Sequence, residues 1–90
     1  MYQVHYSDEV VNNDLTNILE PWKSEIRKAI ELKLMTRPEA YSRPLRRSLK
    51  GYRKLKVGDY RIILRIEDEV VKVFVIQHRS VVYATAPKRL

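Results

Sequence analysis

The chain has 90 residues, no cysteine and a formal net charge of +7. This length predicts one domain, residues 1–90, with a core of modest size, and the lack of cysteine excludes disulfides and thiolate metal sites. No apolar run reaches the roughly 18–20 residues of a membrane helix. The first residues carry no signal-peptide pattern, so we expect a cytoplasmic protein that does not enter a membrane.

Residues 2–37 are predicted to form a strand and two helices. The apolar residues near the start alternate with polar ones, as in a strand with one buried face, and Ser7 is suited to cap the helix that follows. The apolar stripe predicted for the first helix is Val11, Leu15, Ile18 and Leu19. Pro21 separates it from a second helix, whose predicted stripe is Trp22, Ile26, Ala29, Ile30 and Leu34, and Pro38 ends that helix.

Three strands are predicted after a connector that covers residues 38–51. They span residues 52–57, 60–66 and 70–77, with tight turns at Gly58-Asp59 and at residues 67–69. Residues 80–90 are expected to add a short edge strand. The fold class is therefore α+β: an antiparallel sheet with two N-terminal helices packed on one face, in the order strand–helix–helix–strand–strand–strand.

The positive charge is concentrated in the second half of the chain. Residues 1–42 contain five Lys or Arg against seven Asp or Glu, whereas residues 43–90 contain thirteen against four. Such asymmetry favours an anionic partner. The alternative is a basic protein whose charge serves only to keep it in solution.

Strand alternation predicts where the cations of the second half gather. If the apolar residues of the strands face the helices, four cations share the open side of the sheet: Lys54, Lys56, Arg61 and Arg65. Arg79, at the end of the third strand, and Tyr83 lie close by in sequence. Because like charges opposite one another destabilise a sheet, an anionic ligand is the favoured explanation. The alternative is that outward-facing cations discourage aggregation of the sheet.

The run LRRSLKGYRKLKVGDYRIILRIEDEVVKVFVIQHRSVVY resembles the C-terminal half of toxins of the RelE/ParE superfamily, from type II toxin–antitoxin systems. The segments LKVGDYRIIL and HRSVVY are its most specific parts, and the resemblance extends over nearly the whole chain. For the RelE-like branch it implies an mRNA interferase that acts in the ribosomal A site, without metal or cofactor. In that reaction the RNA 2′-OH attacks the adjacent phosphate.

The resemblance also implies roles for individual residues. The positions that match the catalytic set are Lys54, Arg61, Arg79 and Tyr83. The cations that would hold RNA are Arg43, Arg46, Arg47, Lys50, Arg53, Lys56 and Arg65. Tyr52 departs from the pattern, because the most active relatives have a lysine there, and this puts the strength of cleavage in question. His78 is either a further acid or base or a strand-end histidine bonded to the backbone.

The partners that the resemblance implies are a cognate antitoxin, the ribosome and messenger RNA. The free chain is expected to be a monomer that oligomerises only through the antitoxin. Two alternatives stay open: a ParE-like inhibitor of DNA gyrase, and an inactive toxin that serves as a co-repressor with its antitoxin.

Overall fold

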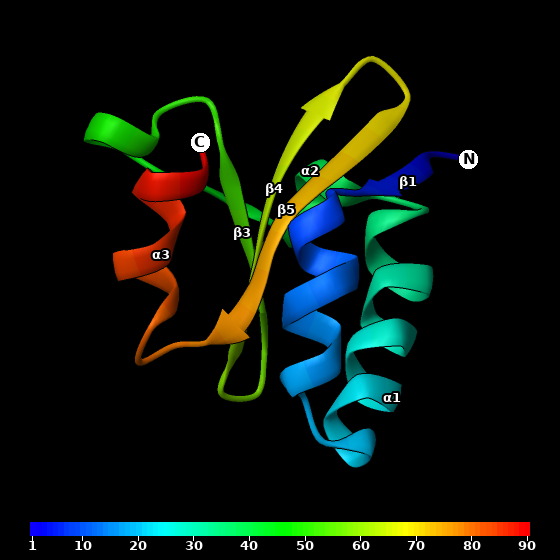
Figure 1. Cartoon of the computed structure of the whole chain (residues 1–90). Coiled ribbons are helices and arrows are strands. Elements are labelled where there is room, and N and C mark those ends of the chain that lie inside the picture. Colours follow the sequence, from blue (N-terminus) through cyan, green and yellow to red (C-terminus); the bar gives the residue numbers. More distant parts are fainter.

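The computed structural model describes residues 1–90 as a five-stranded sheet with helices on both of its faces (Figure 1). In chain order the elements are β1 (Gln3–Tyr6), η1 (Val10–Asp14), η2 (Leu15–Asn17), α1 (Glu20–Ala29), η3 (Ile30–Leu34), α2 (Pro38–Tyr41), β2 (Arg43–Pro44), η4 (Arg47–Leu49), β3 (Arg53–Val57), β4 (Tyr60–Glu67), β5 (Val70–His78) and α3 (Val82–Arg89). None of the helices combines the length and the hydrophobicity needed to cross a membrane.

The strand order in the sheet is β1-β5-β4-β3-β2. The strands from β2 to β5 are antiparallel neighbours, and β1 pairs with β5 in parallel. The predicted α+β class and the three-stranded meander are confirmed, with strand ends that differ by no more than one residue. The parallel pairing of β1 and the short β2 are additions to the predicted antiparallel sheet.

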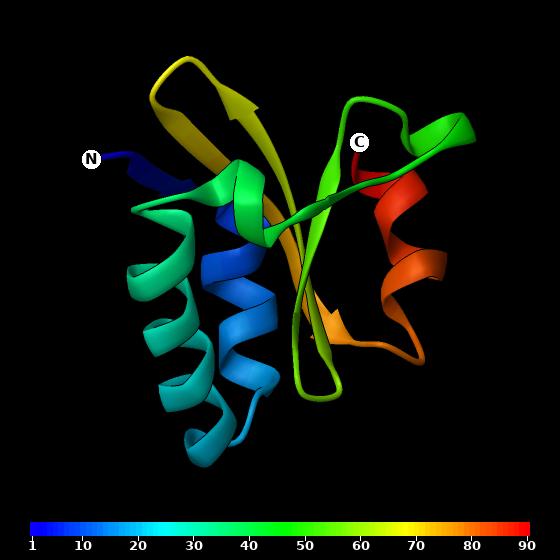
Figure 2. The ribbon, with the colours of Figure 1, turned by 180° about the vertical axis from the view of Figure 1, so that it is seen from behind.

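Two helical segments cover one face of the sheet, as expected, and lie side by side in both views (Figures 1 and 2). Eleven buried residues form the core between them and the strands: Val10, Ile18, Ile26, Ile30, Leu34, Leu55, Ile62, Leu64, Val71, Val73 and Ile76. The stripe predicted for the first helix was partly wrong, because Val11 and Leu19 are exposed. Val10, Asp14 and Ile18 point inward instead, at the i, i+4 and i+8 spacing of one helix face.

The other face of the sheet is covered by the C-terminal helix α3. The prediction of an edge strand over residues 80–90 was wrong. Val82 and Ala86, four residues apart on one side of α3, pack against Ile63 and Val75 and form a second, smaller core. This face of the sheet is therefore not open at its centre, and cations can reach solvent only around α3.

Trp22 of α1 contacts the turn between β3 and β4. Gly58 in that turn has a φ of +57°, which an L side chain rarely adopts, and the Trp22 ring occupies the space that a Cβ would need. The Trp22 ring also packs on Tyr60, with centroids 5.5 Å apart. The helix layer thus fixes the position of this hairpin turn, whose Gly58 carbonyl accepts a hydrogen bond from Arg61.

Candidate functional site

Four cations of β3 and β4 share the face of the sheet that α3 partly covers: Lys54, Lys56, Arg61 and Arg65. Lys56 lies directly opposite Arg61 in the register, and Lys54 lies opposite Ile63, which is in the α3-side core. Side chains at directly opposed positions are about 5 Å apart at Cβ. Arg65 is paired with Glu67, whereas Lys54, Lys56 and Arg61 form no ion pair. Their predicted convergence is therefore present, with α3 beside it rather than an open sheet.

Arg61 is a buried cation without an acidic partner. It is 9% exposed, and its Nη1 donates to the backbone carbonyls of Gly58 and Tyr60, each at 2.9 Å. A buried charge normally requires a counter-charge as well as hydrogen bonds. An anion bound at this end of the hairpin would supply it.

Tyr83 stands at the start of α3 and leans over β3. The Lys54 ammonium lies 5.9 Å from the centre of its ring, and Tyr83 is 41% exposed. The contact has the geometry of a weak cation–π pair. It places a phenol hydroxyl and an amine from two distant parts of the chain on the same exposed surface.

His78 is the last residue of β5 and Arg79 follows it, but the two side chains face different surroundings. The Arg79 backbone N–H donates to the Asp59 carbonyl at 2.8 Å, and its exposed guanidinium lies 3.9 Å from the Asp59 carboxylate. His78 is paired with Tyr60, whose ring it meets edge-on on the helix-covered side. Its Nδ1 accepts from the Ser80 N–H at 3.1 Å. His78 therefore points away from Lys54 and Arg61.

Two of the seven cations expected to hold RNA have partners within the protein. Arg53 donates to the Ser42 hydroxyl at 2.7 Å and to the carbonyls of Glu39 and Ser42. It therefore ties β3 to the connector.

Arg65 is the other cation with partners in the protein. It is paired with Glu67 and lies over the rings of Tyr52 and Phe74, 5.4 and 5.9 Å from their centres. Tyr52, where a lysine was expected by resemblance, is thus a packing partner of Arg65. Hydrogen bonds from Lys72 and Arg65 hold the pKa of the Glu67 carboxyl below its usual value.

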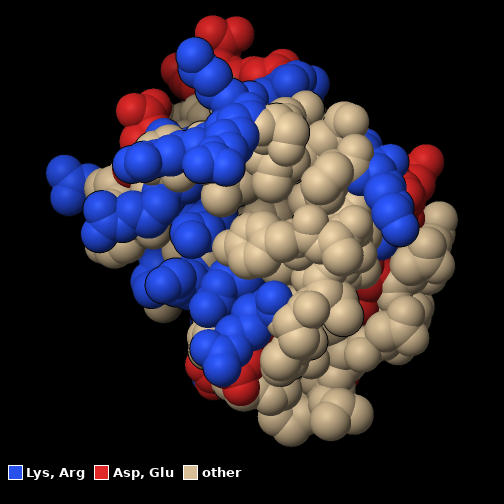
Figure 3. All heavy atoms as spheres, turned by 90° about the vertical axis from the view of Figure 1, so that its left-hand side faces the viewer, with Lys and Arg blue, Asp and Glu red and all other residues tan.

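The remaining cations form a basic surface beside the sheet edge. A groove of about 680 Å³ is lined by Lys33, Tyr41, Arg43, Pro44, Arg46, Lys54, Leu55 and Lys56. No carboxylate lines it, and Arg47 and Lys50 lie exposed on the neighbouring turn. Figure 3 shows Lys and Arg side chains gathered on one side of the α3 face, beside an uncharged centre. We call this group of cations the basic groove.

Lys33 and Tyr41 were not among the residues predicted for the site. Lys33 lies in the helix layer, and its ammonium is 5.6 Å from the centre of the Tyr41 ring. No local sequence signal marks either residue, because only the packing of η3 and α2 against the sheet edge brings them to the groove. They extend the cationic surface from the sheet to the helices.

The arrangement is suited to binding a phosphodiester. It offers several cations and the exposed phenols of Tyr41 and Tyr83, and no acidic side chain lines the groove. Preorganised cations of this kind stabilise negative charge that develops on phosphate oxygens. No three His, Asp or Glu side chains lie close enough together to hold a metal ion.

The fold and this surface together define a small toxin-like α+β protein, and comparison with known proteins identifies its family. Residues 2–83 match the family model for the ParE toxin of the type II toxin–antitoxin system parDE. The chain therefore belongs to the ParE toxin family, within the RelE/ParE superfamily that its sequence resembles. No curated protein sequence gives a significant match.

Solved structures show the same fold. The toxin–antitoxin complex RelBE2 from Mycobacterium tuberculosis contains a chain that is 26% identical, with a TM-score of 0.69, over 87% of this chain and 98% of that one. YafQ from E. coli strain BL21(DE3) is 18% identical, with a TM-score of 0.59, over 92% and 99% of the two chains. The hypothetical protein HP0894 from Helicobacter pylori is 13% identical, with a TM-score of 0.65, over 89% and 97%.

Proposed function

We propose that this toxin is a ribosome-dependent endoribonuclease that cleaves messenger RNA in the A site. The observation that carries the proposal is the buried Arg61, which has no acidic partner and lies beside the unpaired Lys54 and Lys56. Arg65 and Arg89 have carboxylate partners, and Arg53, which bonds to a hydroxyl and to carbonyls, is less buried than Arg61. Arg61 donates its hydrogen bonds to two backbone carbonyls, so its positive charge is not neutralised within the protein and is available to an anionic ligand.

The reaction is a transesterification within the RNA. The 2′-oxygen forms a bond to phosphorus while the bond from phosphorus to the 5′-oxygen breaks, which leaves a 2′,3′-cyclic phosphate and a free 5′-OH. A base takes the 2′ proton, and the departing 5′-oxygen receives one. Arg61 and Arg79 contact the non-bridging oxygens, and Lys54 and Tyr83 take part in proton transfer. Each preorganised contact of this kind typically contributes roughly 10²–10³ in rate.

The basic groove would hold RNA on the approach to these residues. Cations that neutralise phosphates contribute binding that is independent of sequence and falls as salt rises. Arg43, Arg46 and Lys56 line the groove, with Arg47 and Lys50 beside it. The exposed Tyr41 ring offers a surface on which a base can stack. Arg53 and Arg65 have internal partners, so we leave them out of the RNA-binding set.

A cognate antitoxin is the protein partner we propose. The chain of the RelBE2 structure comes from a toxin–antitoxin complex. In the present chain the helix layer exposes Val11, Leu19 and Leu32, and a cavity of about 350 Å³ between the first helix and α1 is lined mostly by apolar residues. An antitoxin with an apolar helix and an acidic segment would cover this layer and neutralise the basic groove.

A second candidate function is inhibition of DNA gyrase. It is favoured by the family match, since the matching family is named for ParE toxins. In that case the toxin acts by binding, and Lys54, Arg61 and Tyr83 need not work together. The unpaired Arg61 favours the ribonuclease.

Primer extension on a messenger translated in a purified system tests the proposal. Wild-type protein is expected to produce cuts within codons only when ribosomes are present, and Arg61→Ala is expected to abolish them. A gyrase supercoiling assay with the same preparations is run in parallel. An intact messenger together with blocked supercoiling would overturn the ribonuclease and establish the gyrase inhibitor.

A further inference from the structure

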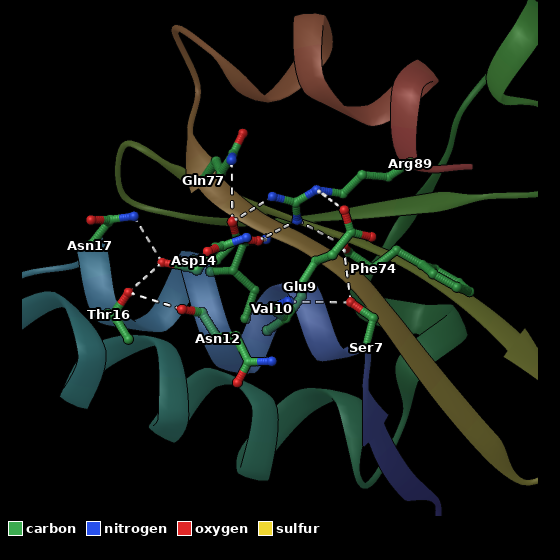
Figure 4. A network of polar contacts seen from close by, with 12 residues as sticks. Ser7, Glu9, Val10, Asn12, Asp14, Thr16, Asn17, Phe74, Gln77 and Arg89 are labelled. Carbon is green, nitrogen blue, oxygen red and sulfur yellow. Dashed lines mark hydrogen bonds and ion pairs between the residues drawn. The ribbon is translucent and has the colours of Figure 1, made fainter.

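Asp14 is the only acidic residue buried in the structure, although it lies far from the basic groove. Its carboxylate accepts from the Ile76 backbone N–H at 2.8 Å and from Gln77 Nε2 at 3.2 Å. Arg89 of α3 adds two further donors in a forked geometry, Nη1 at 2.7 Å and Nη2 at 2.9 Å. Figure 4 shows Asp14 between Gln77 and Arg89, where the first helix, β5 and α3 meet.

Asp14 and Arg89 bond to the backbone of β5 beyond the point where β1 ends. The Ser7 N–H donates to the Val73 carbonyl at 3.0 Å, and beyond this point no strand covers that edge of β5. There the Phe74 carbonyl accepts from Arg89 Nη1 at 3.1 Å, and the Ile76 N–H donates to Asp14. Buried backbone groups need such partners. Two side chains thus replace the missing strand and bond to each other as well.

Helix α3 depends on contacts of this kind to keep its place. It has eight residues and contains Pro87, so it is too short to be stable alone. At its start the turn from β5 and the buried Val82 hold it, and near its end Arg89 holds it. The hydrogen bond to Asp14 raises the pKa of the Arg89 guanidinium above its ordinary value, so Arg89 stays charged.

We propose that Asp14 and Arg89 form a positioning clasp that fixes α3 against the sheet and thereby keeps Tyr83 over Lys54. Tyr83 lies about 9 Å along the helix axis from Arg89, in the first turn. Without the clasp, α3 is held at its start, by the core of four buried residues and by the partly buried Leu90 that packs on that core. The helix then pivots and frays, and the Tyr83 ring leaves the Lys54 side chain. The effect on catalysis rests on the function proposed above, whereas the effect on Tyr83 does not.

Hydrogen exchange and nuclear magnetic resonance on Arg89→Ala test the clasp. Lys88→Ala is the matched control, because Lys88 is the adjacent exposed cation of α3 and forms no ion pair. Arg89→Lys keeps the positive charge but loses the paired hydrogen bonds from Nη1 and Nη2 to Asp14. The readouts are the exchange of the α3 amides relative to those of β4, and the Overhauser contacts between the Tyr83 ring and the Lys54 side chain.

The clasp predicts a local change. In Arg89→Ala the exchange of the α3 amides should rise by about 10²-fold relative to the β4 amides, and the Tyr83–Lys54 contacts should vanish. Lys88→Ala should change neither, and Arg89→Lys should recover part of both. Equal acceleration of α3 and β4 would show a purely global role for the pair and overturn the proposal. Unchanged Tyr83–Lys54 contacts would overturn it as well.

A cleavage assay separates this proposal from the ribonuclease. If the wild-type toxin cuts messenger, Arg89→Ala should lower kcat with little change in KM, because the basic groove is left intact. If the wild type cuts nothing, the ribonuclease proposal fails, and the resonance data still decide whether the clasp positions Tyr83.

Discussion

The two faces of the sheet differ in what they bury and in what they leave exposed. The helix-covered face contributes to a core of eleven buried residues, and its strand residues in that core are apolar. The α3-covered face contributes to a core of four, and around it lie Lys54, Lys56 and Arg61 with no acidic partner. One face therefore provides most of the stability. The other carries like charges that destabilise a sheet and that are suited to an anionic ligand.

Ile62 and Ile63 offer a matched test of this division. They are adjacent, identical in type and fully buried, but they point to opposite faces. Ile62→Ala should cost close to 5 kcal/mol and Ile63→Ala only about 2 kcal/mol, because the short α3 can shift to fill part of the cavity. Urea unfolding of both variants measures the difference. Equal losses would mean that the two cores contribute equally.

Gly58 contacts Trp22 of the helix layer, and its carbonyl accepts from Arg61 on the other face. Its replacement should therefore affect both stability and the site. In Gly58→Ala the new Cβ meets the Trp22 ring at a backbone φ of +57°. A loss of about 1–3 kcal/mol is expected from strain and overpacking. Because the Gly58 carbonyl accepts from Arg61, cleavage should fall as well. Urea unfolding followed by fluorescence of Trp22, the single tryptophan, gives the free energy of unfolding. A variant as stable as the wild type would show that the contact with the ring is loose.

Lys56 tests the basic groove without disturbing the core. Lys56→Ala should weaken binding to programmed ribosomes and reduce the slope of log K against log salt by about 0.7–0.9, the value for one phosphate contact. Lys28→Ala is the control, since Lys28 is an exposed cation on the outer side of α1. Equal slopes for Lys56→Ala and the wild type would remove Lys56 from the RNA-binding surface.

Glu67 should affect stability only weakly and only above acidic pH. Its pKa is lowered in the folded chain because Lys72 and Arg65 donate hydrogen bonds to it. A carboxyl with a lowered folded pKa stabilises above its unfolded pKa, and the effect is lost as pH falls through the folded value. Glu67→Gln should therefore lower Tm at about pH 7, and the difference from the wild type should shrink as the pH falls and the Glu67 carboxyl is protonated. A pH-independent difference would assign the effect to packing instead.

Much of the fold was predictable because it rests on local patterns. Alternating strand residues and two tight turns predict the meander, and apolar spacing predicts α1. The stripe predicted for the first helix was right at Leu15 and Ile18 and wrong at Val11 and Leu19, because it counted only apolar residues. Its inward face is Val10, Asp14 and Ile18, and a buried aspartate cannot be recognised without its distant partner Arg89.

The sequence predicted which residue types gather at the candidate site, but not which of the cations have partners within the protein. The register places Lys54, Lys56 and Arg61 together, as alternation predicts. Helix α3 was missed because Val81, Val82 and Tyr83 favour a strand locally, and the helix depends on contacts far away in sequence. The same holds for Arg53 and Arg65, whose internal partners lie in the connector and at the far end of β4.

A direct comparison of Arg61→Ala and Arg65→Ala tests the central claim, because both arginines lie on β4 and point to the same face. In the translated-messenger assay, Arg61→Ala should lose about 10²–10³ in cleavage rate with little change in Tm. Arg65→Ala should lower Tm, through loss of its contacts with Glu67 and Tyr52, and keep the cleavage rate of the folded protein. If both variants lose activity only in proportion to stability, the unpaired Arg61 has no special role and the account is contradicted.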